Sequence, residues 1–453
     1  MPSAQLAGFI LASALITLNG TATTIALPAI GHDLGTSVFR LQWISNAPLL
    51  SLAALLLPAG MVADRFGRVR VIRVGLVTFV AGAIACMLAP TDVALIGATF
   101  VQGAGGALVL PAALAPLRDA YSDAAERARV FGLWAAGTGV ASAVGPLLAG
   151  GLVDIVSWRA VFAPSAAAAV AAILLVKGDV AGAAPTRRHP VPLVATLAMM
   201  LMLGAAAYLL MSLVGGDVDT RHVVVPVVII VAAAVPLARD RQRHLLLPRE
   251  LLGSRNCLPA NASTFALYFG MFGLSFLVAL YTQQALGYSA LRAALVLLPI
   301  SVMLVLAEPF GRLTTRVGTR ALISAGALSA AAGLYWMASG PHPLPFWSRL
   351  IVGTASFGLG ISLAVSALTH AAVAAVPETC AGAASGLNHA VVRAAGLIAV
   401  ALLGSLAAPG VSDAISAEGF SRAMTICAAV VGVGGVLGSV WLRDEEPGGI
   451  ANH

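Results

Sequence analysis

Four ionisable side chains lie inside long apolar runs of this sequence, where an ionised group is costly and therefore suggests a function. They are Glu308, His370, His389 and Arg393. A carboxylic acid or an imidazole can exchange protons in such surroundings, so Glu308, His370 and His389 are candidates for a proton-transfer site. Structural alternatives stay open, because Glu308 could pair with a nearby arginine and His370 could be a packed residue close to a membrane face.

An acid and several arginines are crowded into one short connection between two apolar runs. The segment reads Gly60-Met-Val-Ala-Asp64-Arg65-Phe-Gly67-Arg68-Val-Arg70. A degenerate copy, Gly311-Arg-Leu-Thr-Thr315-Arg316-Val-Gly318-Thr319-Arg320, follows 251 positions later. Both glycines of the first copy recur in the second, and Arg65 aligns with Arg316. This repeat predicts two structurally related halves.

The composition indicates that most of this chain lies in a membrane. Of 453 residues, 59% are hydrophobic and 10% are charged, and the mean hydropathy is +0.94. An ordinary soluble domain carries about 25% charged residues. The net charge of +7 is therefore better explained by the orientation of a membrane protein than by binding to nucleic acid. The lipid bilayer is a predicted partner, and nucleic acid is not.

Runs of about 20 apolar residues, the length that crosses a bilayer, predict an all-α integral membrane protein with about fourteen transmembrane helices. The predicted spans are 5–28, 40–62, 71–90, 93–115, 130–152, 160–177, 191–213, 222–238, 260–284, 290–310, 320–338, 346–374, 381–407 and 422–442. With both chain ends in the cytoplasm, the cytoplasmic connections carry most of the 26 basic residues, in agreement with the positive-inside rule. The predicted units are a six-helix half (1–177), a linker with two additional helices and a cytoplasmic segment (178–255), and a second six-helix half (256–453).

The repeated charged connection resembles the signature loop between helices 2 and 3 of the major facilitator superfamily of transporters. The resemblance implies a major facilitator fold and a gating role for Gly60, Asp64, Arg65, Gly67, Arg68 and Arg316. In that family the acid meets the N-terminus of the helix predicted here at 381–407 and closes the cytoplasmic side. The stretch Gly386-Leu-Asn388-His389-Ala-Val-Val-Arg393-Ala-Ala-Gly396 also resembles a family segment, which implies that Arg393 belongs to the same gating network.

The fifth predicted span is rich in glycine and contains a proline. Gly132, Gly145, Pro146 and Gly150 match the exporter signature G-x8-G-x3-G-P-x2-G-G of drug antiporters, although Ala141 and Ala149 replace two of its glycines. Small residues allow a neighbouring helix to approach closely and proline permits a bend, so we expect this helix to pack against the other half. The two helices between the halves resemble the fourteen-helix drug:proton antiporter branch, and a hairpin without functional weight is the alternative for them.

Two charges that are typical of this branch are missing. The segment Leu18-Asn19-Gly20-Thr21 resembles one in which an aspartate takes part in proton coupling, and Thr99 replaces an arginine that the family links to proton transfer. An amide and a hydroxyl do not titrate at physiological pH, whereas a neutral pair can form hydrogen bonds without the cost of a buried ion. Either coupling has moved to Glu308, His370 or His389, or the chain transports without a proton gradient.

Several side chains in the spans fit a ligand cavity, because such cavities are mostly apolar with a few oriented polar groups. The cavity candidates are Asn19, Trp43, Asn46, Thr99, Gln102, Phe272, Gln283 and Asn388. Ordinary helix packing or contact with lipid is the alternative for the aromatic members. Pro48 predicts a kink in the second span.

The sequence does not favour an enzyme. It contains no P-loop pattern, and its cysteines show no metal-binding or disulfide spacing, so we expect neither a nucleotide nor a metal nor another cofactor. We expect a monomeric, multi-pass protein of a bacterial cell membrane that exports small apolar or amphipathic molecules, with protons as a candidate coupling partner. Two alternatives stay open, namely a proton-independent facilitator or importer of a neutral solute, and a transporter-like sensor or scaffold that moves nothing.

Overall fold

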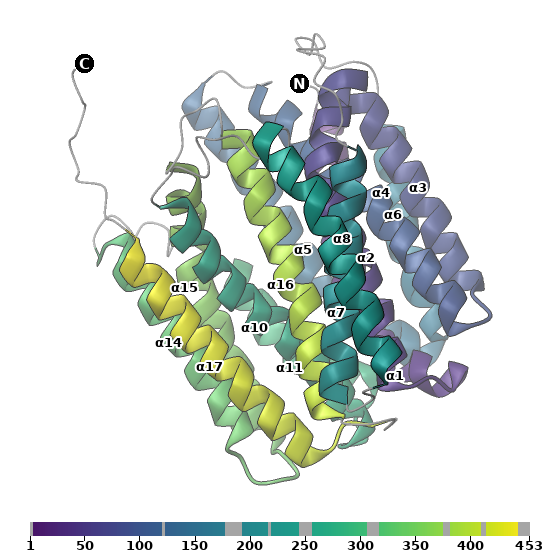
Figure 1. The fold of residues 1–453 in the computed structure, drawn as a ribbon, viewed down its shortest axis with the longest axis vertical. Coiled ribbons are helices and arrows are strands. Elements are labelled where there is room, and N and C mark those ends of the chain that lie inside the picture. The colour runs from purple at the N-terminus through teal and green to yellow at the C-terminus, as the bar shows by residue number, and fades with distance from the viewer. Residues whose placement is uncertain are drawn as a thin grey trace.

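The computed structural model describes residues 3–119, 123–176, 193–215, 219–243, 256–305, 317–374, 381–408 and 414–442. The regular structure of these residues is helical, and long helices lie side by side in one bundle (Figure 1). The first group comprises α1 (Ser3–Leu34), α2 (Val38–Phe66), α3 (Arg68–Leu88), α4 (Asp92–Asp119), α5 (Ala124–Ile155) and α6 (Ala163–Leu175). The second group comprises α10 (Cys257–Gln284), α11 (Ala290–Val305), α14 (Thr319–Ala338), α15 (Val352–Ala374), α16 (Ala381–Ala407) and α17 (Ala417–Trp441). Between the groups in sequence come α7 (Leu193–Gly215) and α8 (Thr220–Arg243).

Most of these helices are suited to cross a membrane. Among the described residues, twelve helices are long and apolar enough to do so, and α2 makes a thirteenth if its two bent parts form one span. The shorter α11 has 16 residues. This confirms the predicted all-helical membrane fold. Helix ends differ from the predicted limits because polar caps lengthen helices beyond their apolar parts: α5 begins at Ala124, where the Asp123 carboxylate accepts a hydrogen bond from the Glu126 N–H at 2.9 Å.

The bend in α2 lies at a different proline from the predicted one. The parts Val38–Leu56 and Pro58–Phe66 meet at an angle of 56°. Proline removes a backbone hydrogen bond and its ring clashes with the preceding turn, so Pro58 accounts for this bend. Pro48 lies within the first part of the helix, and the kink predicted there stays a prediction.

The sequence repeat is also a structural repeat. Gly67 ends α2 and Gly318 precedes α14, and their φ angles of +91° and +89° are nearly equal. Side chains rarely adopt this conformation, which explains why both copies of the segment keep glycine there. In each group, an arginine shortly after this glycine donates a hydrogen bond to a backbone carbonyl at the C-terminal end of the group's last helix. Arg73 donates to the carbonyl of Val176, and Arg320 donates to that of Leu442.

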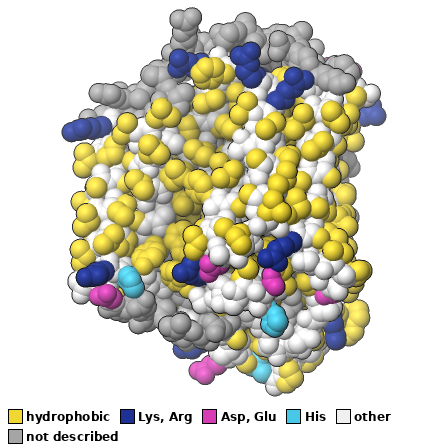
Figure 2. All heavy atoms as spheres, turned by 90° about the vertical axis from the view of Figure 1, so that its right-hand side faces the viewer, with side chains coloured by type: hydrophobic (Ala, Val, Ile, Leu, Met, Phe, Trp, Pro, Cys, Tyr) yellow, Lys and Arg dark blue, Asp and Glu magenta, His cyan; other side chains and the backbone are white. Residues whose placement is uncertain are grey.

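The outer surface carries a broad apolar band. Figure 2 shows hydrophobic side chains across the middle of one face, with charged side chains above and below. On α3, which lies on this side of Figure 1, Val74, Val77, Ile84 and Leu88 are exposed. In water such a face would be unfavourable. Its arrangement between two charged rims is that of a surface surrounded by lipid.

Of the two additional helices, α7 packs against both groups. α7 contacts α8, α2 of the first group and α16 of the second group. A small apolar cluster that includes Leu50, Met211 and Leu397 fills this junction. Trp43 packs against the same cluster, with its ring 6.5 Å from that of Tyr208 of α7. The prediction that Trp43 lines the cavity was therefore wrong, because α7 covers this side of α2.

Candidate functional site: a central cavity closed at one end

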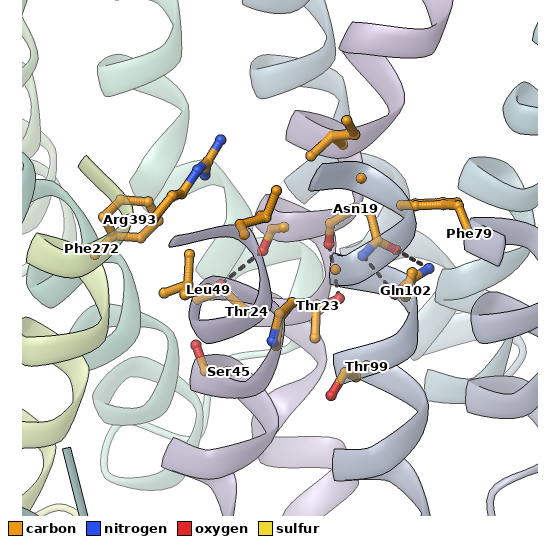
Figure 3. Close-up of a pocket in the computed structure, with 16 residues that line it drawn as sticks. Asn19, Thr23, Thr24, Ser45, Leu49, Phe79, Thr99, Gln102, Phe272 and Arg393 are labelled. Atoms are coloured by element: carbon orange, nitrogen blue, oxygen red, sulfur yellow. Dashed lines mark hydrogen bonds between the residues drawn. The ribbon is translucent and has the colours of Figure 1, made fainter. Parts of the chain in front are cut away.

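A cavity lies between the two groups of helices (Figure 3). Segments of α1, α2, α3 and α4 form one wall, while α10 contributes Phe272 and α16 contributes Arg393. Four of the predicted cavity residues, Asn19, Thr99, Gln102 and Phe272, do line it. Pro48, Leu49 and Leu52 add apolar surface. The cavity thus combines an apolar lining with a few polar groups.

Asn19 belongs to a neutral and buried hydrogen-bond network. Its amide donates to the Gln102 Oε1 at 2.9 Å, and the Gln102 amide donates back to the Asn19 Oδ1 at 3.1 Å. The Ser165 hydroxyl of α6 donates to the same Asn19 oxygen at 3.0 Å. All three side chains are buried. Amide and hydroxyl groups therefore satisfy one another where the family places an acid.

Thr99 is not part of this network. Its hydroxyl donates to the Ile96 carbonyl of its own helix at 3.0 Å. Asn19 instead pairs with Gln102, because the longer Gln102 side chain reaches across from α4 while the short Thr99 hydroxyl turns back to its own backbone. Ser165 was missed by the sequence analysis, since a lone serine near the start of a helix carries no motif.

Arg393 lacks such partners. No hydrogen bond or ion pair joins it to another described residue, and its buried Nε has no acceptor. Figure 3 places its guanidinium beside Phe272, across the cavity from Asn19. Of the sixteen residues that line the cavity, Arg393 is the ionisable one. His389 lies one turn earlier on α16 and is partly buried.

Several hydrogen bonds between the two groups lie at one end of the bundle, which we call the Asp154 end, while Ser142 of α5 and Ser301 of α11 join the groups nearer its middle. The Gln42 amide of α2 donates to the Val400 carbonyl at 2.7 Å and to the Ala401 carbonyl at 2.9 Å. The Gln283 amide of α10 donates to the Ile25 carbonyl of α1 at 3.0 Å. Gln283, predicted to line the cavity, thus joins the two groups instead.

Asp154 itself joins α5 to α11. Its two carboxylate oxygens accept hydrogen bonds from the backbone N–H groups of Ala290 and Leu291, each at 3.0 Å. These N–H groups begin α11 and have no partner within that helix. α5 continues to Ile155 and carries the exposed Asp154 carboxylate to the start of α11.

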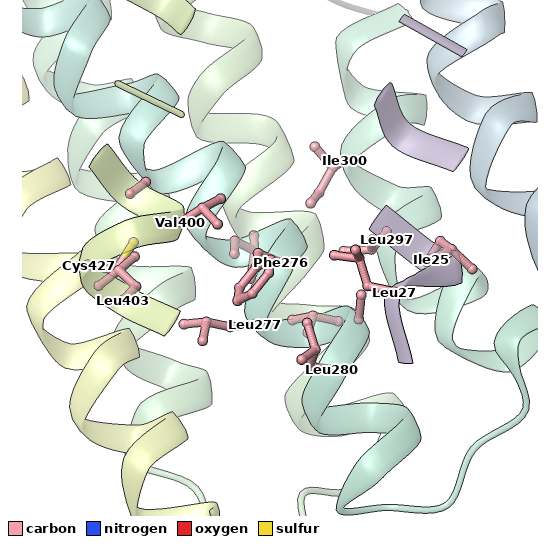
Figure 4. Packing of buried hydrophobic residues seen from close by; sticks show 14 of the residues in the cluster. Ile25, Leu27, Phe276, Leu277, Leu280, Leu297, Ile300, Val400, Leu403 and Cys427 are labelled. Atoms are coloured by element: carbon pink, nitrogen blue, oxygen red, sulfur yellow. The ribbon is translucent and has the colours of Figure 1, made fainter. Parts of the chain in front are cut away.

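These contacts separate the cavity from the Asp154 end. In each of four helices, the residue that makes the contact lies nearer that end than the residue that lines the cavity. The contact residues and the corresponding cavity residues are Ile25 and Asn19 in α1, Gln42 and Ser45 in α2, Gln283 and Phe272 in α10, and Val400 and Arg393 in α16. Figure 4 shows apolar side chains of α1, α10, α11 and α16 packed together in the same region. The structure therefore represents a conformation that is closed at the Asp154 end.

The glycines of α5 face different neighbours. A Cβ on Gly145 would lie 2.9 Å from the Leu18 carbonyl of α1, within the same group. A Cβ on Gly150 would lie 2.6 Å from the Leu291 Cα of α11, in the other group. Nothing lies within 4 Å of a Cβ on Gly132. The predicted contact with the other half is thus confirmed for Gly150 and was wrong for Gly145, because the two positions point to different sides of the helix.

The opposite end of the bundle contains the charged connection around Gly67. Asp64 is half exposed and pairs with Arg68 at 3.4 Å, while Arg65 lies over the Phe66 ring at 5.3 Å. A Cβ on Gly60 would meet only Pro111, at 3.9 Å. In this conformation the Asp64 carboxylate has no recorded bond to the described part of α16. The predicted closing contact with α16 therefore stays a prediction.

The remaining candidates lie apart from the cavity or outside the described residues. Asn46 is fully buried, lacks a hydrogen bond and does not line the cavity. Asn388 donates to the Thr264 hydroxyl at 3.1 Å. Glu308 and Arg316 fall outside the described residues, as does the side chain of His370. Among the residues with assigned structure, no group of three or more His, Cys, Asp or Glu could hold a metal ion.

Comparisons with known proteins agree with this architecture. Residues 9–400 and 262–452 match the sequence profile of the Major Facilitator Superfamily. The chain is 31% identical to a methylenomycin A resistance protein of Streptomyces coelicolor, covering 84% of this chain and 80% of that protein. It is 30% identical to the puromycin resistance protein pur8 of Streptomyces alboniger, covering 93% and 85%. Identity to the multidrug resistance protein Stp of Mycobacterium tuberculosis is 29%, covering 88% and 74%.

Solved structures with a similar fold include peptide transporters. A crystal structure of the peptide transporter POT in complex with sulfate superposes with a TM-score of 0.73 and 17% identity, covering 97% of this chain and 94% of that one. A POT family transporter in complex with 5-aminolevulinic acid gives a TM-score of 0.73 and 15% identity, covering 97% and 96%. At this identity the likeness concerns the fold alone.

Proposed function

This chain belongs to the major facilitator superfamily, among relatives that confer drug and antibiotic resistance, and we propose that it exports small apolar or amphipathic compounds from the cell by alternating access. It is a transporter and not an enzyme. Six helices on each side of a central cavity supply the two bodies that such a cycle requires. We propose 1–177 and 256–453 as these bodies and 178–255 as the linker between them.

One observation carries this proposal: the cavity lies between the two groups and contacts between the groups close it at the Asp154 end. Alternating access requires a site between two bodies that part at one end while they meet at the other. With both chain ends in the cytoplasm, the Asp154 end faces outward. The structure then corresponds to the state from which a compound in the cytoplasm or the inner leaflet enters the cavity.

The fourteen-helix plan is part of the same proposal. α2 with its bend and the shorter α11 would each count as one span, which gives fourteen helices in a monomer with both ends in the cytoplasm. The arginines around Gly67 then lie on the cytoplasmic side, as the positive-inside rule requires. The position of α7 against α2 and α16 supports a role for the additional helices as a cover over one seam between the two bodies.

The chemistry around Asn19 bears on energy coupling. Its amide, Gln102 and Ser165 satisfy one another as neutral groups. None of these three groups exchanges a proton at physiological pH. We therefore propose a cycle in which no proton binds at this position, and the candidates for coupling elsewhere remain Glu308, His370 and His389. A facilitator that moves solute without protons is the second candidate function, and the neutral network is the observation that favours it.

The test is drug susceptibility combined with transport in vesicles. Cells that overproduce the protein should tolerate higher concentrations of at least one compound in an antibiotic panel that includes puromycin, compared with cells producing the Gly150→Val variant at the same membrane level. Inverted vesicles should accumulate that compound. An imposed pH gradient should drive accumulation above equilibrium in an antiporter, whereas a facilitator should only equilibrate the compound. Unchanged susceptibility across the panel together with no uptake by vesicles would refute export.

A further inference from the structure

The cavity contains a charge that the described residues do not balance. Arg393 carries a guanidinium that remains protonated at every physiological pH. The remaining cavity-lining residues are apolar, hydroxyl-bearing, amide or glycine residues. The ion pairs between described residues, Arg40–Asp92, Arg68–Asp64 and Arg159–Asp33, lie towards the two ends of the bundle. The described part of the chain therefore supplies no anion to Arg393.

The titratable groups near Arg393 on α10 and α16 are not anions. Tyr268 of α10 interacts electrostatically with Arg393, and His389 lies one turn earlier on α16. Neither is an anion under ordinary conditions. The buried Nε of Arg393 has no acceptor among the described residues. An anion brought in by a ligand would supply one.

Most polar side chains of the opposite wall already have hydrogen-bond partners. Asn19 and Gln102 bond to each other through both of their amide groups. The Thr23 and Thr24 hydroxyls donate to the Asn19 and Gly20 carbonyls of their own helix. These donors are neutral and most of them already have an acceptor, so the charged guanidinium is the strongest donor group in the cavity.

An aromatic surface lies directly beside the cation. A Cβ on Gly396 would lie 2.7 Å from the Phe272 ring, so this ring rests on α16 at Gly396. Gly396 is three residues after Arg393 and shares its helix face. Figure 3 shows the Phe272 ring and the Arg393 side chain next to each other at one side of the cavity. An apolar contact surface and a forked cationic donor are thus adjacent.

We propose that this cavity selects amphipathic organic anions, with Arg393 binding the acidic group and Phe272 packing against the apolar body. The guanidinium fork matches the two oxygens of a carboxylate or a sulfonate. This inference rests on the proposed function for its direction of transport, while the binding preference can be measured by itself. It assigns Arg393 to substrate recognition in addition to the gating role that the sequence implies.

The experiment compares three probes that share one aromatic body: naphthaleneacetic acid, naphthaleneacetamide and naphthylethylamine. Affinities for the purified full-length transporter are measured by thermal shift and by quenching of intrinsic fluorescence, and flux is measured in proteoliposomes. The wild type should bind the acid about tenfold or more tightly than the amide, the range expected for a hydrogen bond to a charged group. Arg393→Gln should reduce this preference to near unity, and Arg393→Lys should retain part of it. Arg349→Gln, which removes an arginine that lies over Trp336 at the surface, is the matched control and should bind like the wild type.

The outcomes separate this inference from export itself. A wild type that binds the acid no better than the amide overturns the anion site, even if it transports other drugs. A folded Arg393→Gln variant that loses flux of all three probes equally, with unchanged affinities, also overturns it and leaves Arg393 with gating alone. An Arg393-dependent preference for the acid supports the site, whether or not vesicles concentrate that acid.

Discussion

The carboxylate of Asp154 should hold the outer end of the transporter closed. It accepts two hydrogen bonds from the first N–H groups of α11, and those groups belong to the opposite body. Asp154→Asn keeps one oxygen as an acceptor but removes the negative charge and one of the two bonds. We therefore expect the variant to populate the outward-open conformation more than the wild type does.

The size of this effect follows from the geometry. A carboxylate at a helix N-terminus contributes about 0.3–1 kcal/mol when exposed and about 2 kcal/mol when partly buried. Asp154 is exposed to solvent, so screening limits its contribution to about 1 kcal/mol or less. A change of about 1 kcal/mol corresponds to a roughly fivefold shift in the ratio of the two conformations.

The assay uses the rate at which a cysteine in the cavity reacts with a reagent that cannot cross the membrane. Thr24 lines the cavity below the outer closure, so Thr24→Cys in a background without other cysteines reports on opening to the outside. In whole cells, an impermeant maleimide should label this cysteine about fivefold faster when Asp154→Asn is added, since labelling follows the open population.

Asp92→Asn is the matched control. Asp92 lies at the same end and accepts from Thr36 at 2.7 Å and from Arg40 at 3.4 Å, but both partners belong to its own group of helices. Its loss removes the same charge without breaking a contact between the bodies. An unchanged labelling rate in a well-folded Asp154→Asn variant, or an equal increase in both variants, would refute the reasoning.

Three further predictions concern the other contacts. Gly150→Val should abolish export because its side chain would meet the α11 backbone, whereas Gly151→Val has open space around its Cβ and should transport nearly normally at equal membrane level. Asn19→Leu should lower stability by about 1–3 kcal/mol because it leaves buried polar partners unsatisfied, which thermal unfolding in detergent measures. Thr99→Arg, at a site that is 1% exposed, should reduce the folded yield more than Asn19→Asp does, which chromatographic yield measures. Asp64→Asn should increase labelling of the cavity from the cytoplasmic side, and an unchanged rate would place the inner closure elsewhere.

The sequence predicted the helices and the internal repeat well because both depend on local chemistry. An uninterrupted apolar run must become a helix in lipid, since no other single segment satisfies its own backbone there. Gly67 and Gly318 could be identified because a positive φ selects glycine in each copy. The predicted cavity residues Asn19, Gln102 and Phe272 were found because polar and aromatic side chains in apolar spans are few.

The partners of these residues could not be predicted, because they depend on how two helices are rotated and shifted against each other. A one-residue difference in position turns a side chain by about 100° around a helix. Gly145 and Gly150 belong to one motif, yet they face α1 and α11 respectively. Asp154 presented no motif at all, and only the placement of α11 beside it reveals its role.

The net charge of each cavity wall can be explained separately. The family pattern places an acid where Asn19 stands and a base where Thr99 stands, so the loss of both leaves the net charge of that wall unchanged. Replacing only one of them would have left a buried ion without a partner, which is strongly unfavourable. Arg393 lies on the other wall and is unaffected by this double exchange. Loss of the ionic pair and selection of an anionic compound are therefore separable properties, and a variant can change one while it keeps the other.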